Sequence, residues 1–567
     1  MLNLNRTQTK LLLISLWTLA NIVQAYFTEL AHDEAYYWVY SEYLDIGYFD
    51  HPPMIAFMIK AGYLLFQNEL GVRLMAILFS SATLLILDEL TERKNFKLIF
   101  SIYVAFTCFH IYGFIATPDT PLIFFTALFF LAYKKYLSAD SIKNVLLLSF
   151  TIAALLYSKY HGILILLFVI LSNLKLFTKR SFYAIITVSV LVYLPHILWQ
   201  VNNDYPSYQY HVQNRNQMPY KPMDTLNYII GLILIVSPLL FPFVVKSFLT
   251  FKNTPASAIP GLNAKFKRAL TFVITGFTVF FLFSTLNTRA EANWNIPILI
   301  PLAIILFWYA AHNSSARTWV FKLSVATLVI FSLVRLHLMI DLVPSFIKIK
   351  DEFHQNQSWA EDIEGLADGA PVVFSNSYQN ASKHYFYSKK PSHSHNNAQY
   401  RRNQFDLWPL VDSLQGEKVL FVANWDSPRF DTMNTSKGVL RYEFLEHFHS
   451  MNNVKVLADK SPRTGLVGSE IEIPVTLINT TDKPIKFGEH DSDRSLMMVA
   501  IQHNQRSYSS SYTDMLRGKT LTDSLQLTIS LEVPEIPSKY YFRVNLKTGA
   551  LPETLNGDLI RLHAILE

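Results

Sequence analysis

Long apolar runs recur through the first three fifths of the 567-residue chain and then stop. A helix needs a run of roughly 17 to 25 apolar residues to cross the hydrocarbon core of a bilayer. Runs of this kind, some of them short, predict an α-helical polytopic membrane protein with about eleven transmembrane helices. Their expected positions are 10–28, 70–90, 98–116, 121–137, 144–158, 162–178, 181–200, 225–245, 269–286, 296–311 and 319–340.

The composition agrees with a membrane protein. Hydrophobic residues make up 51% of the chain and charged residues 16%, whereas an average soluble chain is about one quarter charged. The formal net charge of +6 comes from Lys and Arg residues spread over short loops, so no basic face for nucleic acid is expected. Cys108 is the only cysteine and lies in an apolar run, which excludes a disulfide framework.

Lys and Arg gather in alternate loops, beginning with the N-terminal segment. Cytoplasmic loops carry an excess of these residues, so the N-terminus is expected inside the cell. The first run is interpreted as an uncleaved helix, because no small-residue cleavage site follows it. An odd number of helices then places the C-terminal third outside the cytoplasm. On that outer side the basic residues are few: Lys60, Arg73, Lys159, Arg215, Lys221 and Arg289.

The last two fifths of the chain follow a different pattern. Residues 350–450 mix a helical pattern at 347–366 with the strand-like runs PVVFSNS and KVLFVANW, which predicts a small α/β domain. From about residue 453, alternating runs such as EIEIPVTLIN and LQLTISLEVP predict a β-sandwich of immunoglobulin-like type. The HSH triplet at residues 393–395 is expected in a solvated loop. The predicted domains are therefore a membrane domain at 1–345, an extracytoplasmic α/β domain at 346–452 and a β-sandwich-like domain at 453–567.

The first outer loop, residues 30–53, is rich in carboxylates and aromatic rings. Such a loop lies at the membrane–water boundary, where rings prefer to lie and carboxylates stay hydrated. Asp33 and Glu34 are adjacent, so their side chains diverge, and one can act while the other is structural. Solvated loop charges or a helix N-cap explain them equally well. The candidate site residues of this loop are Asp33, Glu34, Tyr36, Tyr37, Asp50 and His51.

Two short motifs add candidates at the same boundary. Asp119 in TPDTPL either caps a helix that begins with proline or supplies the second acid of a paired site that deprotonates a hydroxyl or binds a divalent cation. SKYHGI brings Lys159 and His161 to the outer boundary. A lone lysine there usually snorkels to the interface, and its alternative role is to bind a phosphate.

Two later loops complete the candidates. The longest outer loop, rich in Tyr, Asn and Gln, holds His211 and Arg215 and suits a ring-faced polar ligand or an interfacial aromatic belt. NTRAEANWNIP adds Glu291 and Arg289, whose planar fork can bind two phosphate oxygens. If the loops converge, these side chains form one site. A divalent cation stays open, because Asp33, Asp50, Asp119, His51 and His211 offer ligands without a tight metal motif.

Five stretches in this order resemble one family. DEAYYWVYSEYLDIGYFDHPPM, TPDTPL, SKYHGIL, LPHILWQVNNDYPSYQYH and AEANWNIP are similar to polyprenyl-phosphate-sugar-dependent glycosyltransferases of the GT-C fold. More narrowly, they resemble the bacterial relatives of protein O-mannosyltransferases and of the aminoarabinose transferase that modifies lipid A. The similarity covers about residues 10–340, and the motifs are specific in combination.

The resemblance implies an enzyme of the bacterial inner membrane that takes a sugar from a polyprenyl-phosphate carrier on the extracytoplasmic face. Asp33 is then the expected catalytic carboxylate and Glu34 its companion, while Asp119 helps to form the polar pocket. The family is generally inverting, which needs one base and a phosphate leaving group. The expected acceptor is a hydroxyl or phosphate on a lipid, glycan or protein of the cell envelope.

Three other functions compete with this one. A polymerase or ligase for surface polysaccharide would also use a lipid-linked sugar, but from a diphosphate carrier. A transporter would keep its ionisable residues near the bilayer midplane and often has inverted repeats, whereas the charges here gather at one face. A scaffold or receptor would explain the C-terminal third but not the charged, aromatic first loop.

Overall fold

The computed structural model divides the chain into two compact units. They are Met1–His354, the membrane unit, and Gln355–Glu567, the C-terminal unit. The further division of the C-terminal unit after residue 452 stays a prediction. The structure describes residues 5–214, 220–259, 262–342, 352–398, 400–481, 483–488, 494–503, 506–549 and 551–566.

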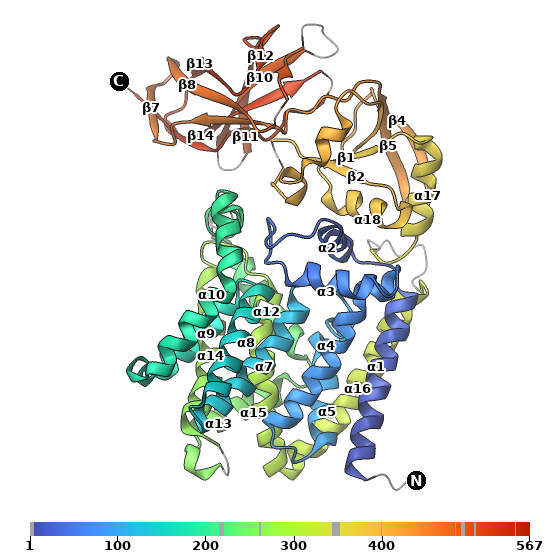
Figure 1. Ribbon diagram of the computed structural model, residues 1–567, viewed down its shortest axis with the longest axis vertical. Helices are drawn as coiled ribbons and strands as arrows, with labels where there is room; N and C mark the ends of the chain where they lie inside the picture. The colour runs from blue at the N-terminus through green and yellow to red at the C-terminus, as the bar shows by residue number, and fades with distance from the viewer. Residues whose placement is uncertain are drawn as a thin grey trace. The chain divides into compact units, whose positions relative to one another are not determined.

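The membrane unit is a bundle of helices (Figure 1). Eight of its helices, among them the longest, are α1 (Arg6–Phe27), α4 (Glu69–Leu90), α7 (Asp119–Ser138), α8 (Ile142–Ser158), α10 (Arg180–Asn202), α14 (Ala264–Ser284), α15 (Leu299–His312) and α16 (Ser314–Met339). The others are α2 (His32–Glu42), α3 (Met54–Tyr63), α5 (Phe96–Ala105), α6 (Thr107–Ile111), α9 (Gly162–Ser172), η1 (Leu174–Thr178), α11 (Pro206–Tyr208), η2 (Gln209–Asn214), α12 (Pro222–Val236), α13 (Phe241–Asn253), η3 (Ala256–Ala258) and η4 (Ala292–Ile298).

Short polar side chains begin many of these helices. An N-cap side chain accepts a hydrogen bond from a free backbone N–H group of the first turn. Such a cap matters at a membrane surface, because the first turn cannot leave its N–H groups unpaired in lipid. The capping residues are Asn5, Asn68, Asn95, Ser141, Asn263 and Asn313.

The structure confirms a membrane region with several spans. Judged by length and composition, however, fewer helices than the predicted eleven can cross a membrane. Among the described residues, six helices are long and apolar enough to cross a membrane, and α12 and α13, which meet at 91°, would make a seventh. The run at 98–116 is divided between α5 and α6, and the run at 162–178 between α9 and η1. The six are α1, α4, α10, α14, α16 and the stretch Ala292–His312.

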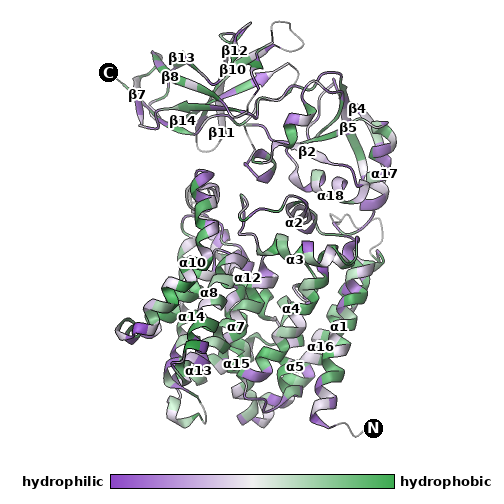
Figure 2. Ribbon diagram, in the orientation of Figure 1, coloured by the Kyte–Doolittle hydropathy of each residue, from purple (hydrophilic) through white to green (hydrophobic). Residues whose placement is uncertain are grey.

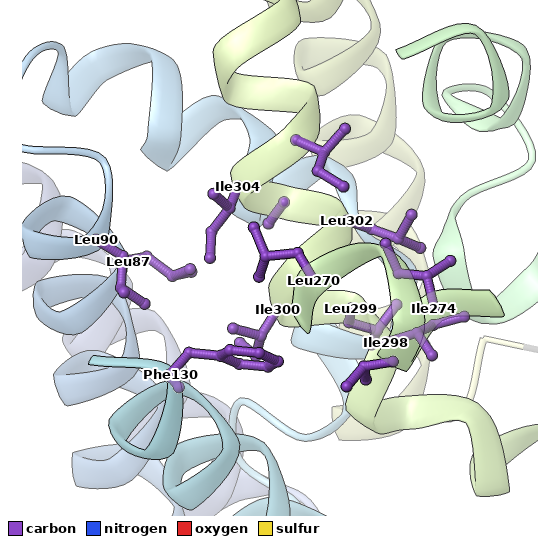
Figure 3. Packing of buried hydrophobic residues seen from close by; sticks show 14 of the residues in the cluster. Leu87, Leu90, Phe130, Leu270, Ile274, Ile298, Leu299, Ile300, Leu302 and Ile304 are labelled. Atoms are coloured by element: carbon purple, nitrogen blue, oxygen red, sulfur yellow. The ribbon is translucent and has the colours of Figure 1, made fainter. Parts of the chain in front are cut away.

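The core of the bundle is built around α15. Its side chains Ile300 and Ile304 lie among Leu87 of α4, Phe130 of α7 and Leu270 of α14, all of them buried (Figure 3). Most of the stretch Ala292–His312 is buried, whereas only a small part of α1, α10 and α16 is buried. Apolar residues dominate the helices of this unit (Figure 2), so these three exposed helices are suited to face lipid.

The C-terminal unit contains two groups of sheets (Figure 1). The first is a mixed five-stranded sheet of order β2-β1-β3-β5-β4, with β1 parallel to β2 and β3. The predicted runs PVVFSNS and KVLFVANW contain β1 and β3. Its elements are β1 (Val372–Ser375), β2 (Ser392–His395), β3 (Val419–Ala423), β4 (Asp431–Thr435) and β5 (Gly438–Leu445), with α17 (Asn356–Ala367), α18 (Tyr378–Ser388), η5 (Gln404–Asp406) and η6 (Pro409–Leu414).

The second group is β-rich, as the alternating runs predicted. A five-stranded sheet of order β11-β10-β14-β15-β7 and a three-stranded sheet of order β13-β8-β6 share one apolar core, the arrangement of two packed sheets. The strands are β6 (Val454–Ala458), β7 (Arg463–Leu466), β8 (Glu470–Asn479), β9 (Ile485–Lys486), β10 (Ser495–His503), β11 (Arg506–Thr513), β12 (Thr520–Leu521), β13 (Ser524–Glu532), β14 (Ser538–Thr548) and β15 (Ile560–Ile565).

The expectation of a solvated loop at the HSH triplet is wrong. His393 and His395 are buried on β2, where they pair in parallel register with β1. The polar sequence SHSH did not indicate a buried strand, but neutral imidazole is tolerated in a packed interior. Ring contacts with Phe405 and Phe448 surround the two side chains.

Candidate functional site

Helix α2 presents a stripe of acid and tyrosines. Asp33, Tyr36, Tyr37 and Tyr40 are spaced i, i+3, i+4 and i+7, so they share one face of the helix. Glu34 points about a quarter turn away from them. Asp33 is exposed, whereas the tyrosines and Glu34 are buried. The two adjacent acids therefore have different surroundings.

Glu34 forms a buried ion pair with Arg73 of α4. Arg73 Nε donates to one carboxylate oxygen at 2.8 Å and Nη2 to the other at 2.5 Å. The backbone N–H groups of Ala31 and Ala116 donate to the same two oxygens. Glu34 thus holds the start of α2, the start of α4 and the turn before α7 together. The remaining donors of Arg73 bind the carbonyl groups of Ala25, Thr28 and Glu29.

Asp119 and Lys159 form the second buried ion pair. Lys159 Nζ lies 2.6 Å from Asp119 Oδ1, and each residue is 4% exposed. Asn293 Nδ2 donates to the other oxygen, Oδ2, at 3.0 Å. Asp119 begins α7 and Lys159 follows α8, so the pair joins two of the predicted loops. Asn293 brings in the loop that contains the ANWN motif.

Tyr112, just after α6, lies close to both predicted acids. Its hydroxyl group interacts electrostatically with Asp119 and, more weakly, with Asp33. Neither the sequence spacing nor any motif singled out this tyrosine. Asp33 and Asp119 therefore both lie within electrostatic range of one phenol, although 86 residues separate them in the chain.

A third polar group surrounds Asp50. Its Oδ2 accepts hydrogen bonds from the hydroxyls of Tyr36 at 2.9 Å and Tyr40 at 3.3 Å. His211 Nε2 donates to the Asp50 carbonyl oxygen at 2.9 Å. The tyrosines of α2 and the long loop after α10 thus both contact Asp50, near the end of the first loop.

Aromatic contacts extend this group toward Lys159. The ring centroid of His51 lies 5.6 Å from that of Tyr37 and 6.2 Å from that of His211. On its other side, His211 lies 5.8 Å from the ring of Tyr160, the residue after Lys159. The predicted candidates Tyr36, Tyr37, Asp50, His51 and His211 are therefore brought together.

The first loop is held in place by the end of α10. Tyr160 contacts His196, Gln200 and Ser207 through its hydroxyl group at 2.8 to 3.0 Å. Gly47 packs so closely on Trp199 that a Cβ atom would lie 2.3 Å from the indole ring. This close approach requires glycine, because only glycine leaves room for the indole.

Backbone strain marks the approach to His211. Asp204 and Tyr205 both have positive φ angles, 59° and 54°, a conformation that non-glycine residues rarely adopt. The π-helix η2 follows after one short turn and contains His211. Strained residues and π-helical turns cluster at functional sites, and here they bring His211 to Asp50.

The remaining candidates lie apart from the acids or at the edge of these groups. The ring of His161 packs 5.6 Å from Phe281 and 5.5 Å from Trp294. Arg289 is exposed and its Nε lies 3.4 Å from Glu291 Oε1. No ion pair or hydrogen bond in the described ranges joins Arg289 to Asp119 or Lys159, and Arg215 lies outside those ranges.

The structure leaves the cation question open. Within the described ranges, no group of three or more His, Cys, Asp or Glu side chains is placed to hold a metal ion. The ligands that the sequence offered are divided between the Asp119 pair and the Asp50 group. We therefore assign no metal ligands and base no step on a metal ion.

The multi-span helical bundle has the fold of a solved membrane glycosyltransferase, and part of it matches a family model. Residues 50–199 match the family described as dolichyl-phosphate-mannose-protein mannosyltransferase. The match covers 150 of the 567 residues and agrees with the resemblance expected from the sequence.

Two relatives extend the comparison. The chain is 26% identical over 211 residues to lipid A galacturonosyltransferase RgtD of Rhizobium johnstonii, which covers 34% of this chain and 44% of RgtD. The match thus spans less than half the length of that relative. The crystal structure of ArnT from Cupriavidus metallidurans in the apo state is similar with a TM-score of 0.53 and 14% identity, over 77% of this chain and 98% of ArnT. The crystal structure of ArnT bound to undecaprenyl phosphate is equally similar, over 76% of this chain. These structural similarities show the fold.

Proposed function

We propose that the protein transfers a sugar from a polyprenyl-phosphate carrier to an acceptor hydroxyl or phosphate at the extracytoplasmic face of a bacterial inner membrane. The observation that best supports this is the arrangement around Tyr112. It interacts with both Asp33 and Asp119, and Asp119 holds the Lys159 ammonium group at 2.6 Å. This end of the bundle thus offers an exposed carboxylate and a buried cation, the two groups that inverting transfer from a phosphate needs.

Asp33 acts as the base in this mechanism. The acceptor oxygen attacks the anomeric carbon as its proton passes to Asp33, and the bond between that carbon and the phosphate oxygen breaks. The electron pair of the broken bond stays on the leaving polyprenyl phosphate. A positioned base contributes about 10² to 10⁴ in rate. Asp33 suits this role because its side chain is exposed to an arriving acceptor, whereas Glu34 is buried in its ion pair with Arg73.

Lys159 stabilises the leaving phosphate. An ammonium group has three N–H donors, and the Asp119 bond uses one of them. The pair is nearly buried, so the field of the ammonium group is weakly screened there. Fixed charge aimed at developing negative charge is usually the largest contribution to catalysis. The exposed ion pair between Arg289 and Glu291 is weak. The donor phosphate therefore replaces Glu291 as the partner of Arg289, which adds a second cation.

Glu34 and Asp119 position the reacting groups. Glu34 was expected as the catalytic companion of Asp33, and its bidentate pair with Arg73 favours a supporting role instead. Tyr36, Tyr37, His51 and His211 form an aromatic and polar surface beside Asp33, suited to the C–H faces and hydroxyls of a sugar. His161 and Glu291 lie at the edge of the donor phosphate.

The relatives support a lipid donor and a cell-envelope lipid acceptor. RgtD is named for lipid A as its acceptor, and ArnT was crystallised with undecaprenyl phosphate. We therefore place a phosphorylated glycolipid of the lipid A type first among the acceptors, ahead of glycan and protein. The outer location follows from the same charge asymmetry that placed the N-terminus inside.

Mass spectrometry of envelope lipids, glycans and proteins, from cells with and without the protein, tests this function. The expected result is the loss of one sugar mass from one envelope lipid. Loss of glycan chains would favour a polysaccharide polymerase or ligase. Unchanged spectra, with accumulation of a solute on one side of the membrane, would favour a transporter.

A further inference from the structure

A cation in the membrane unit lies outside the site described above. Arg335 is in α16, a candidate membrane span, and its guanidinium group is half-buried between α1 and α6. Ionisable side chains inside membrane helices are costly and usually mark a functional site. The question is which group balances this charge.

The protein partners of Arg335 are neutral. Its Nη2 donates to Asn21 Oδ1 at 2.8 Å and to the His110 carbonyl oxygen at 2.9 Å. The rings of Trp17 and Phe114 cover it, each with a centroid 5.3 Å away. No ion pair in the described part of the chain includes Arg335. The guanidinium group of Arg73 lies 5.5 Å from the centroid of the same Phe114 ring, but Glu34 balances the charge of Arg73.

Two N–H donors beside this cation are buried without a hydrogen-bond partner. They are Arg335 Nε and Asn21 Nδ2. His110 Nδ1 is also unpaired, but His110 Nε2 bonds the Val104 carbonyl oxygen, so Nδ1 is an acceptor and does not add to the donors. A buried donor without a partner costs about 1 to 3 kcal/mol. A water molecule could satisfy both donors, but it would leave the charge unbalanced.

The position of the cluster points to a lipid. Asn21 lies six residues before the end of α1 and Arg335 four residues before the end of α16, which places them about 9 Å and 6 Å below those ends. Arg73 bonds the carbonyl groups of Ala25 and Thr28 at the same end of α1. Little of α1 and α16 is buried, so the cluster lies between helices suited to face lipid, at the depth of lipid headgroups.

We propose that Arg335 and Asn21 bind the phosphate of a lipid headgroup between α1 and α16. An arginine fork pairs with two phosphate oxygens, and the Asn21 amide supplies a further donor. This site is separate from Lys159 and Asp119 and does not depend on the proposed function. If the acceptor is a phosphorylated glycolipid, the site holds its phosphate on the side of Arg73 and Glu34.

Binding of didecanoyl phosphatidic acid to the purified full-length protein in a neutral detergent tests the proposal. Didecanoylglycerol, which lacks the phosphate, is the matched probe. The wild type is expected to bind the phosphatidic acid at least tenfold more tightly than didecanoylglycerol, and Arg335→Met should remove that preference. Arg317→Met, at the other end of α16, should change the affinity less than twofold. Equal affinities for both probes, or an Arg335→Met variant that binds like the wild type, would overturn the proposal.

Two further arms separate the possible sources of phosphate. Arg335→Met should leave the affinity for undecaprenyl phosphate within threefold of the wild type, whereas a tenfold loss would mean that Arg335 belongs to the donor site and that the separate site does not exist. Inorganic phosphate should not compete at equal concentration; competition would replace the lipid with free phosphate. Arg335→Lys keeps the charge without the fork. Arg335→Lys should retain part of the affinity for phosphatidic acid, and it replaces Arg335→Met in the test if Arg335→Met does not fold.

Discussion

Lys159 Nζ lies 2.6 Å from Asp119 Oδ1, and both side chains are almost fully buried where α8 ends and α7 begins. Removing two charges from water costs several kcal/mol per ion, which their attraction repays only with good geometry and further hydrogen bonds. Asn293 supplies such a bond to Asp119. The pair is thus a fixed cation with its counter-ion, at the place where we propose that the lipid phosphate binds.

Breaking this pair should affect stability and activity differently. Lys159→Met leaves Asp119 buried and unpaired, which should cost about 3 to 5 kcal/mol and lower the unfolding midpoint in detergent. Lys159→Met with Asp119→Leu should recover most of that stability, because no buried charge remains. The double variant should still bind the polyprenyl-phosphate donor at least tenfold more weakly. A double variant with wild-type donor affinity would remove Lys159 from the site.

Glu34→Gln separates positioning from catalysis. The substitution removes the charge that pairs with Arg73 but keeps the shape of the side chain, so Asp33 loses a fixed support. We expect a fall in kcat of about 10- to 100-fold, with the apparent pKa values of the pH–rate profile unchanged, because Asp33 still titrates as the base. Loss of one limb of the profile would instead identify Glu34 as a proton-transferring group. Arg73→Lys, which loses the bidentate geometry, should resemble Glu34→Gln.

Arg289 can be tested together with its partner. Arg289→Ala should weaken donor binding about tenfold, because one phosphate contact is lost. Glu291→Gln frees Arg289 from its exposed pair and should leave donor binding unchanged or tighter. A direct binding assay with undecaprenyl phosphate measures both. Equal affinities in Arg289→Ala and the wild type would exclude Arg289 from the donor site.

The C-terminal unit should lose stability in mild acid. Burial lowers the pKa of His384 and His393 to about 3 and of His395 to about 4, whereas unfolded histidine has a pKa of about 6.5. The unfolded chain thus binds more protons below pH 6.5, so stability falls as the pH drops toward 4. Each histidine contributes up to about 1.4 kcal/mol per pH unit in that window.

Asp406 opposes this trend. Burial raises its pKa to about 6, so the folded state binds its proton first and gains stability as the pH falls from 6 toward 4. Three histidines outweigh one carboxyl group, and the net effect is a loss. Thermal unfolding of the full-length protein at pH 7 and pH 5 measures it, and His393→Phe should reduce the difference. A higher unfolding midpoint at pH 5 than at pH 7 would contradict this account.

The sequence singled out polar residues of the predicted outer loops, but not the residues with which they form contacts. Asp119 and Lys159 were recognised as separate candidates from polar residues in apolar surroundings, and the structure pairs them. Tyr112 carried no signal, because a tyrosine in an apolar run looks like any other core or interfacial ring, and Tyr40 was one of several rings in the first loop with nothing to single it out. Arg73 was counted as one outer cation, and only its packing shows that it binds Glu34.

The fold followed the same pattern. Alternation predicted β8, β10 and β13 to β15 because one face of each packs on the shared core. The strand β2 was missed, since SHSH has no apolar alternation and is buried on all sides. Helix breaks such as the one at Phe106, between α5 and α6, depend on tertiary contacts that no local pattern records.

The central claim is that Asp33 is the base of a reaction centre that also contains Asp119 and Lys159. Its most direct test is sugar transfer from a polyprenyl-phosphate donor by purified Asp33→Asn in lipid nanodiscs. Glu42→Gln, on the same helix and in a partly exposed pair with Lys60, is the matched control and should stay within about twofold of the wild type. The account predicts that Asp33→Asn loses about 10² to 10⁴ in turnover while donor affinity and unfolding midpoint remain unchanged. Turnover within threefold of the wild type would contradict it.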